Sequence, residues 1–182
     1  MSVRSLFGAI TALLLAALPV QAASDYLLVL DGIPGESVDA KYPGAIEIET
    51  FSFGVSNAGS VIIGGGGGAG KANFTELSFN KRLDKSSPLL YLNCANGKHF
   101  PSATLILRKP AGDKPFEYYV VKLTEVMVSS VQTGGAAGGG TPTESFSLSF
   151  AKIEFIYTPQ RADGGAGTPV RSGWDVANNV AF

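Results

Sequence analysis

The most regular alternation of apolar and polar residues lies in Glu144–Gln160, near the C-terminal end of the chain. In its first half, Phe146, Leu148 and Phe150 alternate with serines, which is the period of a strand with one buried face. In its second half the apolar positions shift by one, to Ile153 and two aromatic residues. A strand changes its buried face through a bulge or by passing from one sheet to another. We therefore predict a bent strand around which the other strands pack.

Five other segments have a strand-like pattern of apolar residues bounded by turn residues. They are Tyr26–Leu30, Ile46–Val55, Phe74–Leu83, Ala103–Arg108 and Phe116–Val131. The second of these shows the same change of phase and predicts another bent strand. The last has apolar residues at both odd and even positions, which predicts a strand that is covered on both faces. These patterns favour a mainly β fold.

One helix is predicted, over Asp84–Gly97. Ser87 is a possible cap, Pro88 fits the first helical position, and Gly97 fits the position that follows the helix. A helix of about three turns is marginal in isolation. We therefore expect this helix to dock on a sheet.

The N-terminal residues 1–22 have the organisation of a secretory signal peptide. Arg4 supplies the positive charge, an apolar stretch and Pro19 follow, and small residues at Val20 and Ala22 predict cleavage before Ala23. The apolar stretch is shorter than the roughly 20 residues that a membrane span requires. We expect an exported protein, periplasmic or secreted, whose mature part has no membrane span. Residues 23–182 then form a single domain with glycine-rich loops at 64–70 and 134–140.

The charge and cysteine content argue against a nucleic-acid-binding protein and against a fold held by a disulfide within the chain. The net charge of −1 offers no electrostatic footprint for nucleic acid. The one cysteine, Cys94, cannot form a disulfide within the chain, and its place on the predicted helix favours a small buried side chain over a reactive thiol.

The first glycine-rich stretch resembles a nucleotide-binding loop only superficially. Gly65–Lys71 matches the start of a P-loop, and Gly65, Gly67 and Gly70 match the dinucleotide-binding pattern. Both matches are nearly automatic in a run of glycines. A P-loop needs Ser or Thr after the lysine, where this chain has Ala72, and both motifs need a helix next. A strand pattern follows instead, so we predict a plain loop and no cofactor.

The chain also offers few residues for catalysis or metal binding. His99 is the only histidine, and no nucleophile near it in the sequence forms a recognisable set. Together with Cys94 it lacks the spacing of metal ligands. The acidic residues around Asp31 and Asp39 do not follow a calcium-loop pattern. Glu125 interrupts the long apolar strand and either has a buried partner or faces solvent or a lumen. We therefore predict no catalytic residue, no metal site and no enzyme activity.

Taken together, six segments in this order resemble the Hcp family, the haemolysin-coregulated tube proteins of type VI secretion systems. They are DGIPGES (Asp31–Ser37), DAKYPGAIEIETFSFGVS (Asp39–Ser56), FTELSFNKRLDKSSPLLYLNCANGKHFPSATLILRK (Phe74–Lys109), FEYYVVKLTEVMVSSV (Phe116–Val131), ESFSLSFAKIEFIYTPQ (Glu144–Gln160) and GWDVANN (Gly173–Asn179). No single segment is specific, but their order and spacing cover nearly the whole predicted domain.

The resemblance implies a compact β-barrel of two antiparallel sheets with one flanking α-helix. It also implies a homohexameric ring that stacks head to tail into a hollow tube. In that family the tube carries effectors, bears a spike protein at its tip and is expelled by a contracting sheath, and its subunits are not enzymes. Such a ring requires one surface patch to contact a different patch on the next subunit.

The resemblance and the apolar pattern together point to three regions as the subunit interface: the loops Asp31–Ser37 and Ser56–Asn73, and the strand Phe116–Val131. The residues expected there are Asp31, Gly32, Gly35, Glu36, Val61, Ile62, Ile63, Tyr118 and Val120. Two alternatives remain open. One is a monomeric periplasmic or extracellular β-barrel that binds a protein or glycan partner. The other is an enzyme that uses His99.

Overall fold

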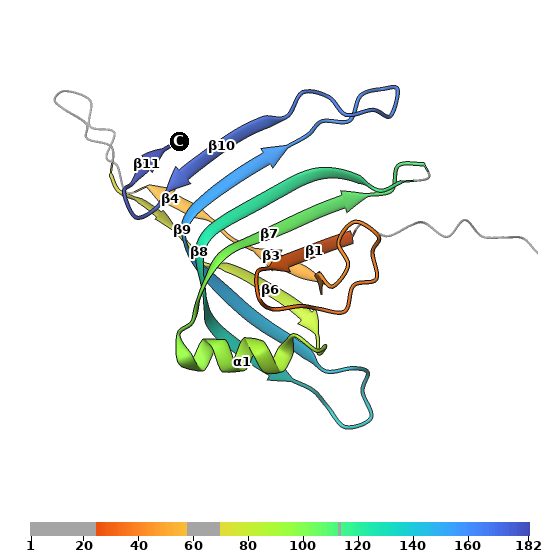
Figure 1. Cartoon of the computed structure of the whole chain (residues 1–182), viewed down its shortest axis with the longest axis vertical. Helices are drawn as coiled ribbons and strands as arrows, with labels where there is room; N and C mark the ends of the chain where they lie inside the picture. Colours follow the sequence, from red (N-terminus) through yellow and green to blue (C-terminus); the bar gives the residue numbers. More distant parts are fainter. Residues whose placement is uncertain (1–24, 58–69, 113) are drawn as a thin grey trace, which may run out of the picture.

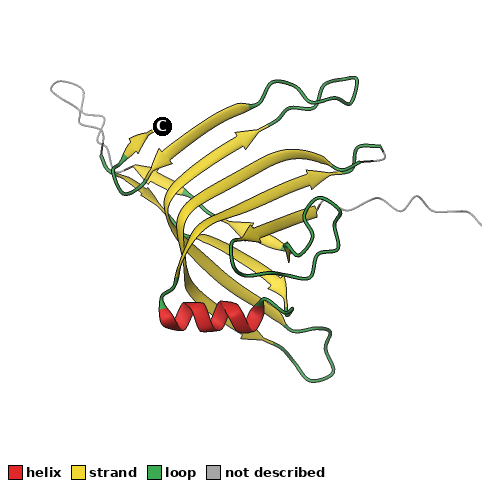
Figure 2. Cartoon of the chain, in the orientation of Figure 1, coloured by secondary structure: helices red, strands yellow, loops and turns green. Residues whose placement is uncertain are grey.

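The structure is a computed structural model that describes residues 25–57, 70–112 and 114–182. The described part contains eleven strands and one helix, α1 (Ser87–Asn96), which lies between β6 and β7 in the chain (Figures 1 and 2). The strands are β1 (Asp25–Leu30), β2 (Ile46–Ile48), β3 (Thr50–Ser52), β4 (Val55–Asn57), β5 (Ala72–Phe74), β6 (Leu77–Arg82), β7 (His99–Lys109), β8 (Phe116–Gly134), β9 (Thr143–Tyr157), β10 (Val170–Asp175) and β11 (Val180–Ala181). The prediction of a mainly β fold with one helix is confirmed.

Nine of these strands form one antiparallel sheet, in the order β11-β10-β9-β8-β7-β1-β2, with β6 pairing with β9 and β3 pairing with β6. The strands β4 and β5 form a separate two-stranded sheet. The two sheets agree with the expected class, but the large sheet is not a closed barrel. Its ladder is interrupted at Glu49, between β2, which pairs with β1, and β3, which pairs with β6.

The strand β9 bends as its sequence predicts. It pairs with β8 along its length, whereas its other edge pairs with β6 over residues 143–148 and with β10 over residues 152–157. Phe146 and Leu148 are buried in the first half, and Ile153 is buried in the second. The change of phase therefore lies where the partner on this edge of β9 changes from β6 to β10 (Figure 1).

The strand β8 differs from its prediction, because it is not covered on both faces throughout. Val121 and Leu123 are buried before Glu125, and Val126 and Val128 are buried after it. Glu125 itself is exposed and has a φ of 53°, in the left-handed region that few residues other than glycine adopt. The apolar residues on the two faces thus belong to two halves of a second bent strand.

The helix α1 lies within the predicted range Asp84–Gly97, but its cap is one residue earlier than the predicted Ser87. Ser86 is the N-cap, and its side chain makes no capping hydrogen bond, whereas Gly97 follows the helix with a φ of 65°, as expected. Leu90 and Asn93 are buried against the sheet. Within the described ranges, no helix is both long and apolar enough to cross a membrane.

A candidate assembly surface

The loop Asp31–Ser37 places three of its four predicted interface residues at the surface. Asp31, Gly32 and Glu36 are exposed, and Gly32 has a φ of 82° that suits glycine. Gly35 is buried instead, and a Cβ added to it would lie 2.4 Å from the backbone oxygen of Ala45. Its N–H donates to the carbonyl of Gly44 over 2.7 Å. Gly35 therefore fixes the path of the loop, and its exposed neighbours are the ones that can contact another molecule.

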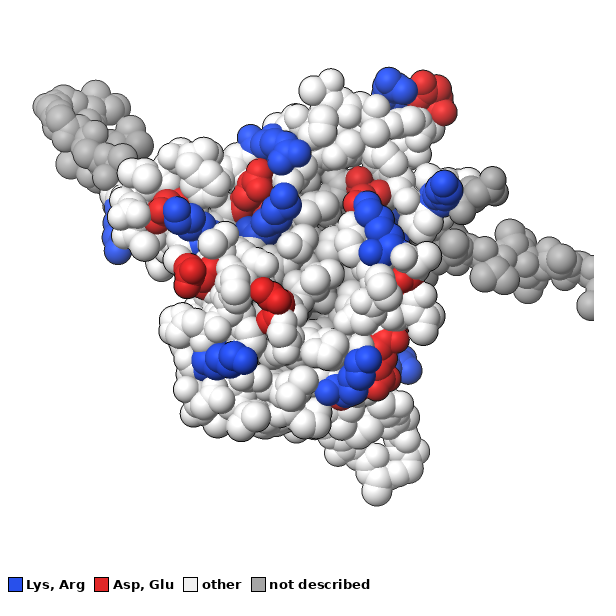
Figure 3. Space-filling view, in the orientation of Figure 1, with Lys and Arg blue, Asp and Glu red and all other residues white. Residues whose placement is uncertain are grey.

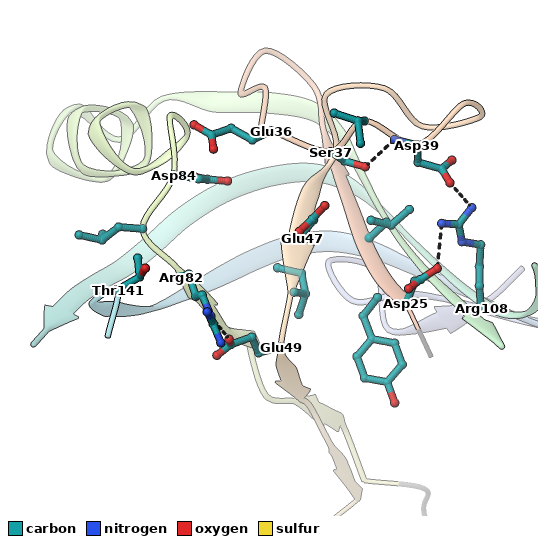
Figure 4. Close-up of a pocket in the computed structure, with 15 residues that line it drawn as sticks. Asp25, Glu36, Ser37, Asp39, Glu47, Glu49, Arg82, Asp84, Arg108 and Thr141 are labelled. Atoms are coloured by element: carbon teal, nitrogen blue, oxygen red, sulfur yellow. Dashed lines mark hydrogen bonds and ion pairs between the residues drawn. The ribbon is translucent and has the colours of Figure 1, made fainter. Parts of the chain in front are cut away.

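An arginine fastens the following segment to the sheet. The Arg108 guanidinium lies 2.8 Å from Oδ2 of Asp39 and 3.2 Å from Oδ2 of Asp25 (Figure 4). Partial burial raises the pKa of Asp39, but the hydrogen bonds from Arg108 and from the backbone N–H groups of Tyr42 and Lys41 outweigh it and hold that pKa below its ordinary value. Asp39 therefore stays ionised, and the loop stays anchored, at neutral pH.

A polar groove lies beside this anchored segment, with a volume of about 620 Å³. Six carboxylates line it (Figure 4): Asp25 on β1, Glu36 and Asp39 in the loop after β1, Glu47 on β2, Glu49 between β2 and β3, and Asp84 after the end of β6. The two arginines in the groove are paired, Arg108 as described above and Arg82 with Glu49 over 2.8 Å. The groove is therefore acidic on balance.

The predicted interface residues on β8 lie at the start of that strand, and both are half-buried. Tyr118 has a raised pKa, first because of burial and then because of the neighbouring Tyr26 hydroxyl. Val120 lies between Ile106 of β7 and Ile156 of β9. Their side chains therefore offer only part of their surface to another molecule.

The predicted interface residues Val61, Ile62 and Ile63 lie outside the described residues, and so does most of the first glycine-rich stretch. The segments that flank it are described and form the β4–β5 hairpin, where Val55 is exposed. A hydrogen bond of 3.0 Å from the N–H of Ala72 to the side-chain oxygen of Asn179 links this hairpin to the C-terminal turn.

A buried charge cluster was not predicted from the sequence. The Lys81 ammonium is fully buried and lies 2.7 Å from Asp84, 3.2 Å from Glu144 and 2.9 Å from the hydroxyl of Ser87. A recognisable signal exists, because Lys81 continues the alternation of Leu77 and Phe79 on β6. Glu144 likewise lies two residues before Phe146, in phase with the buried positions of β9. A charge at an apolar position of a strand pattern indicates a buried pair.

The residues considered for chemistry are not brought together. His99 is the exposed first residue of β7, opposite Met127. Cys94 is half-buried on α1. Across the described ranges, no group of three or more His, Cys, Asp or Glu side chains is arranged to hold a metal ion. Within the described residues, the features that stand out are therefore surfaces that can contact another molecule, and these candidate residues do not form a reactive centre.

Comparison with known proteins gives a consistent result. The family profile described as "Type VI secretion system effector, Hcp" matches residues 26–157. The chain is 45% identical to "Protein hcp1" of Pseudomonas aeruginosa over 159 residues, which cover 87% of this chain and 98% of that protein. Among solved structures, a protein described as a "type six secretion system protein" matches with a TM-score of 0.81 and 34% identity, over 88% of this chain and all of that one. Hcp1 from Salmonella typhimurium matches with a TM-score of 0.73 and 32% identity, over 88% and 100% of the two chains.

Proposed function

Because the chain belongs to the Hcp family of type VI secretion proteins, we propose that it is a structural subunit that assembles with copies of itself into hexameric rings, which stack into a tube. The observation that carries this proposal is the match of 45% identity over 98% of a relative named Hcp1. A match over nearly the whole relative favours a tube subunit over a monomeric binding module, because a ring contact requires two different patches of one domain and this chain covers 98% of the relative.

The assembly surface in this proposal consists of the exposed part of the Asp31–Ser37 loop, the segment Ser56–Asn73 and the start of β8. Electron microscopy of the purified mature chain tests the ring. Particles with six subunits around a central hole support the proposal, and a uniform field of monomer-sized particles contradicts it. In the second case, capture of a partner from an envelope fraction examines the binding-module alternative directly.

The subunit acts by shape and carries out no reaction in this proposal. Its partners are its own copies, a spike protein at the tip of the tube, and effectors that travel in the lumen. A tube of one subunit type needs no cofactor. We expect a substitution at the interface to abolish assembly without abolishing any enzymatic step.

We also propose that residues 1–22 direct export and are removed, so that the mature domain starts at Ala23 and functions in the periplasm or outside the cell. Intact-mass measurement of the protein from cell fractions tests this directly. The expected product begins at Ala23, and a second chain with Ala22→Leu at the cleavage site retains the leader. A full-length chain found only in the cytoplasm contradicts the export proposal and leaves the ring proposal unaffected.

A further inference from the structure

The outer face of α1 has an unusual composition for a surface helix. No residue between Ser87 and Asn96 is charged. The inner face buries Leu90, while Tyr91 and Leu92 are 45% and 59% exposed. A helix whose outer face remains in water generally carries charged residues there. The face around Leu92 therefore has the character of a surface that a second molecule covers.

A second uncharged surface lies beside β10. It is a cleft of about 330 Å³ lined by Phe53, Tyr119, Phe155, Tyr157, Val170 and Ser172. The Phe155 ring stacks on Phe53 with 5.5 Å between centroids and on Tyr119 with 6.4 Å. Tyr157 and Val170 at the mouth are 49% and 67% exposed. The cleft thus has a rigid aromatic floor and an apolar, open rim.

The cleft is bordered by an unused strand edge. The strand β10 pairs with β9 along its whole length, but β11 covers its other edge only at Trp174 and Asp175. Among the strands that the structure describes, none pairs with that edge over residues 170–172. An open edge next to an apolar cleft is a template for contact with another chain.

The two uncharged surfaces lie toward opposite ends of the molecule. Figure 1 has the longest axis vertical, with α1 low in the view and β10 at the top. The surface over α1 is largely free of charged side chains in Figure 3, whereas Lys, Arg, Asp and Glu are scattered over the rest of the visible face. Two different patches at opposite ends permit each copy to contact one neighbour with each patch, which is the heterologous contact that builds a ring when the rotation between copies closes.

We propose that the outer face of α1 on one copy docks in the aromatic cleft beside β10 on the next copy, with Leu92 as the central side chain. The occupant is a second copy because the two surfaces are complementary: both are uncharged, so neither favours a charged partner, and a projecting apolar side chain on one fits a concave apolar site on the other. The helix presents a projecting apolar side chain, and the cleft presents a concave apolar site. The inference rests on the proposed ring and assigns to it a pair of surfaces.

Mixing single-cysteine variants tests this pair. In a Cys94→Ser background, Leu92→Cys and Val170→Cys are purified separately, mixed and oxidised. A disulfide-linked dimer is expected in the mixture, and neither variant alone forms one, because the contact joins two different patches. Ala137→Cys is the control: Ala137 is exposed in the connection between β8 and β9 and lies on neither surface, so its mixture with Val170→Cys gives no dimer.

A charge substitution provides the second measurement. Leu92→Asp places a carboxylate in the aromatic cleft and is expected to weaken association at least about tenfold, whereas Ala137→Asp leaves it unchanged. Circular dichroism shows whether each variant is folded. If rings form and persist in Leu92→Asp, with no dimer in the cysteine mixture, the pair is wrong and the ring proposal stands. If the unaltered mature chain is monomeric at every concentration, both are wrong.

Discussion

Replacing Lys81 by methionine is expected to destabilise the fold strongly, because it leaves a buried carboxylate without its cation. Lys81 and Glu144 have side chains that are 0% exposed, and Nζ lies 3.2 Å from Oε1. The same Oε1 accepts no hydrogen bond, so the lysine charge is its compensation. With an effective dielectric constant of about 20, two unit charges at this separation interact by roughly 5 kcal/mol.

Breaking a buried pair by removing one partner costs about 3–5 kcal/mol, which agrees in size with that interaction. We therefore expect Lys81→Met to lower the free energy of unfolding by about 3–5 kcal/mol, a large share of the roughly 5–15 kcal/mol of a typical domain. The double variant Lys81→Met/Glu144→Leu removes both charges and is expected to recover at least half of the loss. Recovery is incomplete because Asp84, which is 13% exposed, also loses its cation.

Urea denaturation of the mature chain, followed by Trp174 fluorescence at one fixed protein concentration, measures these differences. Lys122→Met is the control, since the Lys122 ammonium lies 3.9 Å from Glu154 and the lysine side chain is 50% exposed. An exposed pair of this kind contributes at most about 1 kcal/mol. A loss in Lys81→Met no larger than that of the control, or a double variant as unstable as the single one, would show that Glu144 does not depend on the lysine charge.

Four further substitutions test the anchoring of the loop, the backbone conformation at two glycines and the absence of catalysis. The folded state lowers the pKa of Asp39 below the ordinary value of 3.8. The carboxylate therefore contributes its full stabilisation above that value, and this stabilisation is lost as the pH falls through the lowered pKa. Asp39→Asn is expected to be less stable than the unaltered chain at pH 7, and acid titrations followed by circular dichroism should show the difference shrinking. Gly35→Ala forces a backbone shift and should cost at least about 2 kcal/mol in urea denaturation. Gly97→Ala meets no atom within 4 Å but holds a φ of +65° and should cost about 1 kcal/mol. His99→Ala should assemble and function like the unaltered chain, and a loss of function with assembly intact would revive the enzyme alternative.

The strand pattern predicted the bent β9 well because one residue of phase shift moves every side chain to the other face. The same rule explains why β8 was misjudged. Apolar residues on both faces are equally compatible with a doubly covered strand and with two half-strands that bury opposite faces. The structure separates the two cases by two irregularities in β8, the φ of 53° at Glu125 and the register shift between Val128 and Ser130. Neither of them is encoded by a glycine, and the charge at Glu125 does not by itself show a change of buried face.

The candidate surface could be predicted only in part, because the fold distributes loop residues between inside and outside. Asp31 and Glu36 are exposed as expected, but Gly35 between them is buried by a backbone contact with Ala45. A single sequence does not show that approach. The absence of charged residues from α1 can be read from the sequence, but whether it leaves an exposed apolar surface depends on which side of the helix faces the sheet. Leu90 faces inward and Leu92 outward, and only the structure shows which.

The mass of the mature chain, residues 23–182, in solution distinguishes a ring subunit from a monomeric domain. Sedimentation velocity over a wide range of protein concentration measures it without labels or surfaces. Assembly into rings predicts a species with six times the mass of the monomer, which persists on dilution and gains larger species when rings stack. A single species with the mass of one chain at every concentration would show that the domain retains the fold of the Hcp family without its assembly.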